Sequence, residues 1–399
     1  MIENEKKVPK RRFKEFENAE AWEQRKFGEI GTVQTCKRIF KEQTSESGDI
    51  PFYKNGTLGL KADAYISREV FEEYKELYSY PRVGDVLISV VGSIGRTAEY
   101  KGNAEYFQDS NIVWLKTDNN IIDKTFLKIS YQIIDWLIEG STIKHLYNDN
   151  ILASKIWIPS SIDEQKAIGG FFDFLDNLIT LQQRKLEKMK ALKKAYLTDM
   201  FPADGERKPK LRFAGFTDNW EQRKLVEVAK YRNGKAHENS ICENGSYVVV
   251  NSKFVSTDGE VRKYSNEQIE PLMKNEIAFV LSDVPNGRAI ARTFLVQEVD
   301  KYTLNQRIAG ITPNENTNPY FLHISINRHP YFLQFDDGVK QTNLSKSDVE
   351  NFETFYPERL EQEKIGVFFS EFDNLITLHQ RKLEKLQNIK KAYLNEMFI

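Results

Sequence analysis

The sequence predicts a mixed α/β protein of the α+β class, in which two globular domains are separated by two long, mutually packed antiparallel helices. The first observation is a repeat, because residues 171–201 and 368–398 are identical at 21 of 31 positions. The second is a pair of shorter repeats, "PKRRFKEF" with "PKLRFAGF" and "WEQRKFGEI" with "WEQRKLVEV". The third is that the amino-acid sequence between these repeated segments differs in the two halves. Together they indicate an internal pseudo-two-fold repeat.

Each long repeated stretch is predicted to be an amphipathic helix. On a helical wheel its apolar side chains fall within an arc of about 100°. Two helices with the same apolar stripe can bury it against each other and keep it from water. The side chains expected to pack this helix pair are Leu175, Ile179, Leu186, Met189 and Tyr196 in the first copy and Ile376, Leu383, Leu386, Tyr393 and Met397 in the second.

The repeat also divides the chain into segments. A length of 399 residues is sufficient for two or three domains. The predicted segments are an N-terminal segment (1–21), a first globular domain (22–157), a first helical spacer (158–201), a linker (202–219), a second globular domain (220–355) and a second helical spacer (356–399).

Within the globular domains, short apolar runs bounded by turn residues indicate buried strands. They include "IPFY", "NIVWLKT", "SYVVVNS" and "RIAGIT". Each half has an apolar run that leads into a turn containing Gly-Arg, "GDVLISVVGSIGRT" and "NEIAFVLSDVPNGRAI". Each half also has a helix-like stretch, residues 124–140 and 318–335.

Composition narrows the class of protein. No stretch reaches the roughly 18 apolar residues of a membrane span, so we expect no membrane association and a cytoplasmic location. Two cysteines, Cys36 and Cys242, make no disulfide framework and agree with a reducing compartment. With a net charge of −1, any surface that binds nucleic acid must be a local patch.

The helix length suggests a spacing function. A helix of 31 residues spans about 46 Å, and one turn of B-DNA is about 34–36 Å. Two domains at opposite ends of an antiparallel helix pair could therefore sit about one DNA turn apart. Such a spacer must keep its length and packing, whereas domains that recognise different sequences need different surfaces.

At this point the sequence resembles a known family, the specificity subunits of type I restriction–modification systems. The resemblance covers essentially the whole chain. It rests on "LDNLI" and "FDNLI" followed by "QRKLEK", "KKAYL" and "MF", on the "EQ" sequence before each helix, on "GDVLIS…GSIGR" and on "WEQRKFGEI". These motifs are specific as a set, and each alone is weak.

The resemblance implies that 22–157 and 220–355 are target-recognition domains. Each would read one half of a bipartite, gapped site on double-stranded DNA, and the paired helices would set the unread gap. It also implies docking of two modification (methyltransferase) subunits and of restriction (endonuclease/translocase) subunits. S-adenosylmethionine, ATP and Mg²⁺ would be used by those partners, with no cofactor bound by this chain.

Three short motifs of this chain resemble parts of catalytic sites. "NPYF" (318–321) lacks the second proline of the amino-methyltransferase motif, and Asn-Pro more often starts a helix. "DEQK" (163–166) has the Glu-x-Lys of metal nucleases but also a capping-box spacing from Ser161 to Glu164. "GSIGR" is too short for a dinucleotide or phosphate loop. The histidines lack metal-ligand spacing, so we expect no catalytic residue and no metal site.

Bases are distinguished by Arg, Lys, Asn and Gln side chains, and phosphates are bound mainly by Lys and Arg. For any one such residue, a solvated turn side chain is the simpler alternative. The candidate DNA-binding residues are Lys54, Asn55, Lys61, Ser93, Arg96, Asn111, Lys144 and Asn148 in the first half, and Arg232, Lys235, Asn251, Lys253, Asn286, Arg288, Arg292, Gln306, Arg307, Lys340, Gln341 and Asn343 in the second.

Two other classes of function stay open from the sequence. One is a helical adaptor that displays two protein-binding domains without binding DNA, which charge neutrality allows. The other is a fused restriction enzyme, which the missing catalytic motifs disfavour. Steep salt dependence of DNA affinity in the assembled complex would argue against the adaptor.

Overall fold

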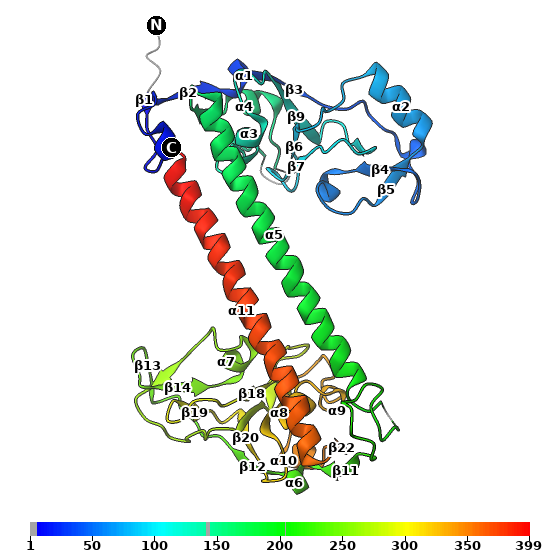
Figure 1. Ribbon diagram of the computed structural model, residues 1–399, viewed down its shortest axis with the longest axis vertical. Coiled ribbons are helices and arrows are strands. Elements are labelled where there is room, and N and C mark those ends of the chain that lie inside the picture. Colours follow the sequence, from blue (N-terminus) through cyan, green and yellow to red (C-terminus); the bar gives the residue numbers. More distant parts are fainter. Residues whose placement is uncertain (1–5, 141–143, 204) are drawn as a thin grey trace. The chain divides into compact units, whose positions relative to one another are not determined.

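The structure is a computed structural model that describes residues 6–140, 144–203 and 205–399. The chain divides into two compact units, unit 1 (Met1–Arg184 with Arg381–Ile399) and unit 2 (Lys185–Gln380). Each unit contains one globular part and about half of each long helix (Figure 1). Among the residues described, no helix is long and apolar enough to cross a membrane.

Unit 1 contains three small sheets. The central antiparallel sheet has the order β3-β9-β6-β7, and in a second sheet β4 pairs with β5 antiparallel and with β8 in parallel. The strands are β1 (Lys6–Lys7), β2 (Trp22–Lys26), β3 (Gly31–Gln34), β4 (Ile50–Tyr53), β5 (Ala64–Ile66), β6 (Val86–Ser89), β7 (Thr97–Glu99), β8 (Tyr106–Phe107), β9 (Ile112–Thr117) and β10 (Lys155–Ile158). The short helices are η1 (Lys14–Phe16), α1 (Phe27–Ile30), η2 (Lys41–Gln43), η3 (Asn55–Thr57), α2 (Arg68–Leu77), α3 (Lys124–Ser130) and α4 (Asn148–Ala153).

Unit 2 repeats this plan. Its central sheet has the order β12-β20-β16-β18, and β14 pairs with β15 antiparallel and with β19 in parallel. The strands are β11 (Glu221–Lys224), β12 (Ala229–Asn233), β13 (Ile241–Cys242), β14 (Tyr247–Val250), β15 (Tyr264–Ser265), β16 (Ile277–Val280), β17 (Ser282–Asp283), β18 (Thr293–Leu295), β19 (Tyr302–Leu304), β20 (Ile308–Pro313), β21 (Thr342–Asn343) and β22 (Glu353–Tyr356). The short helices are α6 (Leu225–Val228), α7 (Ser252–Ser256), α8 (Pro319–Ile326), α9 (Pro330–Leu333) and α10 (Lys346–Glu350).

The equal topology of the two central sheets and the mixture of helices and strands confirm the predicted fold class and internal repeat. The two helix-like stretches are shorter than predicted. In unit 1 the helix ends at Ser130, and the chain turns back so that Trp136 stacks on Phe27. In unit 2 the stretch splits into α8 and α9, because a residue before proline, here His329, avoids the helical region.

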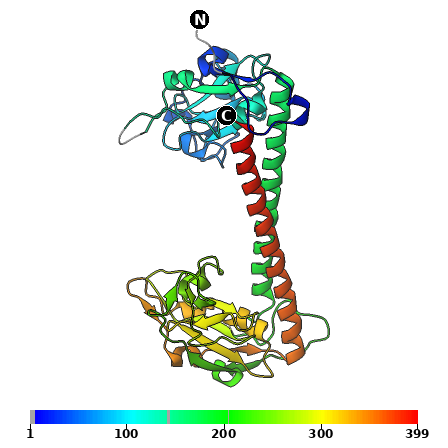
Figure 2. The ribbon, with the colours of Figure 1, turned by 90° about the vertical axis from the view of Figure 1, so that its left-hand side faces the viewer.

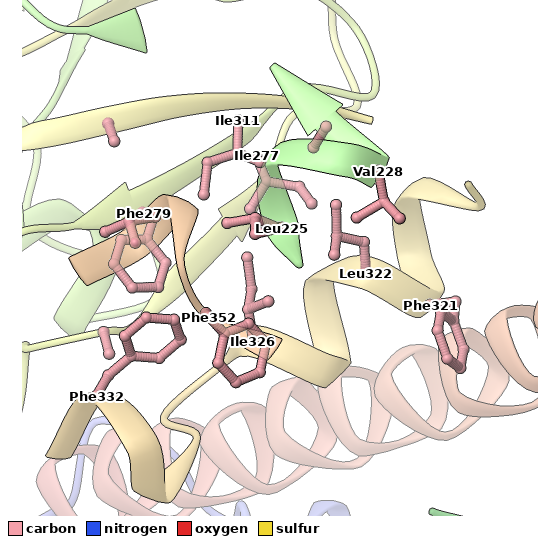
Figure 3. Close-up of a cluster of buried hydrophobic side chains, with 14 of the residues drawn as sticks. Leu225, Val228, Ile277, Phe279, Ile311, Phe321, Leu322, Ile326, Phe332 and Phe352 are labelled. Carbon is pink, nitrogen blue, oxygen red and sulfur yellow. The ribbon is translucent and has the colours of Figure 1, made fainter. Parts of the chain in front are cut away.

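Each central sheet is covered by a helix that fills the core. In unit 2, α8 places Phe321, Leu322 and Ile326 among side chains of the sheet such as Ile277 and Ile311, all fully buried (Figure 3). The strands of unit 2 lie to one side of its part of α11 (Figure 2). This packing fixes the strands, and with them the loops at their ends.

The two long helices are α5 (Ile162–Asp199) and α11 (Arg359–Met397), and they pack in antiparallel fashion within both units. In unit 1 the Asp176 carboxylate pairs with the Lys390 ammonium at 2.6 Å, and the rings of Phe171 and Tyr393 lie 5.0 Å apart. The equivalent side chains meet in unit 2, where Lys193 pairs with Asp373 and the Tyr196 ring lies 5.2 Å from the Phe368 ring.

The residues predicted to pack the helix pair are buried or half-buried. Leu175, Leu186 and Met397 are buried. Half-buried positions are occupied by Ile179, Met189, Tyr196, Ile376, Leu383, Leu386 and Tyr393. Other apolar residues of the repeat, among them Leu181 and Leu375, are largely exposed.

Both units anchor the start of a long helix with the same buried ion pair. The Arg12 guanidinium donates two hydrogen bonds of 2.6 Å to Glu164, near the start of α5. Arg212 donates two hydrogen bonds of 2.7 Å to Glu361, at the equivalent place in α11. These bidentate pairs explain the shared "RRF" and "LRF" sequences.

The glutamine that follows each buried glutamate ties the long helix to the covering helix. Gln165 Oε1 accepts a hydrogen bond of 2.8 Å from the backbone N–H of Asp123, which caps α3. Gln362 Oε1 accepts one of 2.9 Å from the N–H of Asn318, which caps α8. The "EQ" dipeptide is therefore a structural motif that is used twice.

The repeat has a circular character. In unit 1 the N–H of Arg11 donates to the carbonyl of Glu396 at 2.8 Å, so the N-terminal segment lies against the end of α11 (Figure 1). In unit 2 the N–H of Leu211 donates to the carbonyl of Asp199 at 2.8 Å. The same contact thus joins the N-terminal segment to the end of α11 in unit 1. In unit 2 it joins the end of α5 to the linker that follows it.

Candidate nucleic-acid interface

The loops that carry most predicted DNA-binding residues of unit 1 meet at one end of its central sheet. Three backbone hydrogen bonds join them: Gln108 N–H to Tyr53 O, Val90 N–H to Asn111 O and Leu146 N–H to Val90 O, each 2.9 Å. These bonds gather the segments after β4, β6 and β8 and the segment before α4. Polar side chains from distant parts of the sequence therefore share one surface.

Side chains reinforce this surface. Arg96 Nη1 donates to the carbonyl of Gly56 at 3.0 Å, and the Asn55 amide bonds Ser89 Oγ and the Val91 carbonyl. The Lys54 ammonium pairs with Asp63 at 3.2 Å. Several polar groups of Arg96 and Asn55 are thus already used within the protein.

The remaining predicted residues of unit 1 are half-buried or exposed. Ser93 is half-buried in the turn and Asn111 is half-buried just before β9, whereas Lys61, Lys144 and Asn148 are exposed. Gly92 and Gly95 have positive φ values of 66° and 79°, which explains the two glycines of the "GSIGR" turn.

Unit 2 gathers its loops by the same three backbone hydrogen bonds. They run from Asn305 N–H to Val250 O at 3.1 Å, from Leu281 N–H to Arg307 O at 3.0 Å and from Leu344 N–H to Leu281 O at 2.8 Å. Each bond has a counterpart of the same kind in unit 1. The backbone scaffold is therefore shared, although the loop side chains differ.

This scaffold changes one equivalence drawn from the sequence. The two Gly-Arg turns, at Arg96 and Arg288, look alike in sequence. In the structure Ser89 N–H donates to Arg96 O, and Val280 N–H donates to Arg292 O, both at 2.9 Å. Arg292 is therefore the structural counterpart of Arg96, because the loop of unit 2 (281–291) is longer than that of unit 1 (90–95).

Two predicted residues of unit 2 are used in internal ion pairs. Arg232 donates hydrogen bonds of 2.7 and 2.8 Å to the buried Glu276 and also pairs with Glu270, and the hydrogen bonding to Glu276 raises the pKa of Arg232. Lys235 pairs with Glu270 at 2.8 Å. Both cations are thus engaged on β12 and just after it, and structural roles explain them.

The other predicted residues of unit 2 lie on the shared loops. Lys253, Arg288, Arg307 and Lys340 are exposed. Asn251 caps α7, accepting a hydrogen bond of 2.9 Å from Phe254 N–H. Three other side-chain amides donate hydrogen bonds within the protein. Asn286 donates to the Gly338 carbonyl at 3.0 Å, and Gln306 donates to Glu238 at 2.7 Å. Gln341 donates to Ser282 at 2.7 Å and to Asn343 at 3.2 Å.

An additional arginine, missed by the sequence reasoning, joins this surface. Arg328 follows α8 and donates to the carbonyl of Ile290 at 3.2 Å, next to Arg292, whose Nε donates to the Arg288 carbonyl at 2.8 Å. Burial lowers the pKa of Arg328, and the nearby Arg292 charge lowers it further. Three arginines gathered around one turn favour an anionic partner. Only the helix break at "NRHP" hinted at this loop.

A hollow of about 540 Å³ lies beside these loops in unit 2. Asn251, Lys253, Asn305 and Arg307 are part of its lining. Neutral amides and exposed cations in one concave surface are the groups that bind base edges and phosphates.

Two of the short motifs that resemble catalytic sites have structural roles. Glu164 of "DEQK" is fully buried, paired with Arg12 and hydrogen-bonded by Trp22 Nε1 at 3.2 Å. Asn318 of "NPYF" caps α8. Burial raises the pKa of the Cys36 thiol to about 12, which makes it inert at neutral pH. In the described part of the chain, no group of three or more His, Cys, Asp and Glu side chains is arranged to hold a metal ion.

Comparisons with known proteins add to this picture. The family described as type I restriction modification DNA specificity domain matches the chain twice, over residues 19–191 and 217–388. A putative type I restriction enzyme specificity subunit, S.HindORF215P of Haemophilus influenzae, is 51% identical over 156 residues, which cover 38% of this chain and only 40% of that protein. The type I restriction enzyme MjaVIII specificity subunit of Methanocaldococcus jannaschii is 24% identical over 307 residues, 72% of each chain.

Among solved structures, the crystal structure of a type I restriction–modification system S subunit from M. genitalium has a similar fold. Its TM-score is 0.69 at 16% sequence identity, with 98% of this chain and 99% of that chain covered.

Proposed function

Because this chain belongs to the family of type I restriction–modification DNA specificity domains, we propose that it is the DNA specificity subunit of such a complex. Each unit reads one half of a bipartite, gapped site on double-stranded DNA. The chain itself catalyses no reaction. Modification and restriction subunits carry the chemistry with S-adenosylmethionine, ATP and Mg²⁺, and the complex works in the cytoplasm.

The observation that carries this proposal is the shared scaffold of the loops. The same three backbone hydrogen bonds hold the loops in both units, while side chains at equivalent positions differ, such as Gln108 and Asn305 or Asn111 and Arg307. A constant scaffold with variable side chains suits a pair of readers with different target sequences. An enzyme with the same active site in both units would need the same side chains in both, so this variation disfavours such an enzyme.

The long helices suit the role of a spacer. Helices α5 and α11 contain 38 and 39 residues, about 57 Å each at 1.5 Å per residue. The ion pairs Asp176–Lys390 and Lys193–Asp373 fix their mutual register within the two units. In this proposal the helix pair sets the unread gap.

The outer faces of the helices suit docking of two modification subunits. Phe174 and Leu181 of α5 are 60% and 50% exposed, and with Leu178 they have the i, i+4, i+7 spacing of one face. Val367 and Leu378 of α11 are also exposed. Apolar side chains in helical spacing bind partner helices by burying that face.

The direct test is a methylome of cells that express this chain with its methyltransferase subunit. The expected result is one gapped motif. Replacing residues 22–157 with the corresponding domain of a relative should then change one half-site and leave the other unchanged. Absence of any sequence-specific methylation, or a swap that leaves both half-sites unchanged, would overturn the proposal.

The spacer role has its own test. Seven residues are inserted into α5 after Met189 and seven into α11 after Ile376, which adds about 10.5 Å to each helix. The gap in the methylated motif should lengthen by about three base pairs, with both half-sites kept. An unchanged gap in a methylating complex contradicts the spacer role.

A further inference from the structure

Unit 2 carries two tight turns that are each closed by their own aspartates. The Asp283 carboxylate accepts hydrogen bonds from the N–H groups of Val284 at 2.9 Å and Ile290 at 3.0 Å. The Asp337 carboxylate accepts from the N–H groups of Val339 and Lys340, both at 2.9 Å. The negative charges are thus directed into the backbone of the turns.

These turns are also fixed to each other. The Asn286 amide, in a turn with φ of 53°, donates to the carbonyl of Gly338 at 3.0 Å. A Cβ at Gly287 would lie 2.1 Å from the Asp283 carboxylate, so a larger residue there would displace this carboxylate from the turn. Gln341 further ties the second turn to Ser282. The turns form a pre-organised pair.

The side chains presented by this pair include two exposed valines. Val284 is 64% exposed and Val339 is 77% exposed, the highest value among the large apolar side chains described. Cations adjoin them, because Arg288 and Lys340 are exposed on the same two turns. An isolated exposed valine needs no explanation. Two on linked, rigid turns beside cations suggest an apolar contact within an anionic partner.

Resting on the proposed function, we propose that Val284 and Val339 contact thymine methyl groups in the major groove of the half-site read by unit 2. The thymine C5-methyl is the apolar feature of base edges in that groove. A β-branched side chain loses little rotamer freedom on contact, and Arg288 and Lys340 provide charges for the neighbouring phosphates. Unit 1 has a shorter turn at this place, in which Val90 is buried and Val91 is half-buried, so that turn presents no fully exposed valine.

The test uses the assembled complex of this chain with its methyltransferase subunit and DNA that carries its methylation motif. Each thymine of the unit 2 half-site, on either strand, is replaced singly by deoxyuridine, which removes only the methyl group. At one or more positions the Kd of the wild-type complex should rise about fourfold, the effect of one buried methyl group. Val284→Ala with Val339→Ala should abolish the difference between thymine and deoxyuridine there.

Val299→Ala is the matched control. Val299 is 62% exposed, but it lies before β19, whereas the candidate loop that contains Arg307 follows β19. This variant should keep the wild-type preference for thymine. The proposal is overturned if the wild-type complex ignores every deoxyuridine in that half-site. It is also overturned if the double alanine variant loses affinity equally for all sequences, as a wedge between bases would. If the proposed function itself is wrong, the complex of this chain with its methyltransferase subunit has no methylation motif, and this result precedes the deoxyuridine test.

Discussion

Removing the Arg12 guanidinium should strongly destabilise unit 1. Its side chain is 6% exposed and that of Glu164 is 1% exposed. Arg12 also donates to the carbonyls of Ala19 and Glu20, both at 2.9 Å. In Arg12→Leu, Glu164 would keep the hydrogen bond from Trp22 Nε1 but lose its cation, and a buried carboxylate without its cation is costly.

The expected loss is about 3–5 kcal/mol, the range for breaking a buried ion pair by removing one partner. With a urea dependence of about 3 kcal/mol per molar, the unfolding midpoint should fall by about 1–1.7 M. Four of the five tryptophans, Trp22, Trp114, Trp136 and Trp157, lie in unit 1, so tryptophan fluorescence reports mainly on that unit. Urea titration followed by fluorescence therefore measures this change.

The neighbouring residue provides the control. Arg11 pairs with Glu396 at 2.5 Å, but the side chains are 53% and 39% exposed. Arg11→Leu should leave the midpoint almost unchanged, since exposed pairs are screened by solvent. Arg12→Met combined with Glu164→Leu should recover much of the loss. Equal midpoints for the Arg11 and Arg12 variants would refute the assignment of the buried pair as the anchor of α5.

Three further outcomes are expected. Burial lowers the pKa of His323 to about 4 from 6.5, so the unfolded chain binds more protons than the folded chain between these pH values. The stability of unit 2 should therefore fall with decreasing pH, by up to about 1.4 kcal/mol per pH unit. His323→Gln should flatten this pH dependence of the urea midpoint of unit 2 between pH 7.5 and 5. Arg328→Ala should reduce the salt slope of DNA affinity of the assembled complex by about 1 without changing the motif; a changed motif would mean base contact. A circular permutant that joins Ile399 to Pro9 through a copy of residues 202–208, and opens the original linker, should keep a wild-type melting curve; loss of cooperative unfolding would contradict the circular repeat.

The long helices and the repeat could be predicted because both follow from local sequence. A continuous apolar period of 3.6 residues specifies a helix, and an identical stripe in two places specifies a partner for it. The limits of α3 and α8 could not be predicted in the same way. Trp136 leaves the helical pattern because it packs on Phe27, a residue far away in sequence.

Individual site residues were harder to predict, because the chemistry of a cation depends on its neighbours. Arg232 and Lys235 look like contact residues in sequence, yet Glu270 and Glu276 engage them. Arg328 looked like part of a helix and instead lies beside Arg292. Only the fold decides which charges are neutralised internally.

The location of the candidate interface follows from the backbone more than from its side chains. Hydrogen bonds such as Leu146 N–H to Val90 O and Leu344 N–H to Leu281 O involve no side chain. Substitutions on these loops can therefore change the exposed groups without moving the loops. Loop length can change as well, as the longer segment before Arg292 demonstrates. A recognition surface built in this way can acquire a new target sequence while the helices and their buried anchors stay the same.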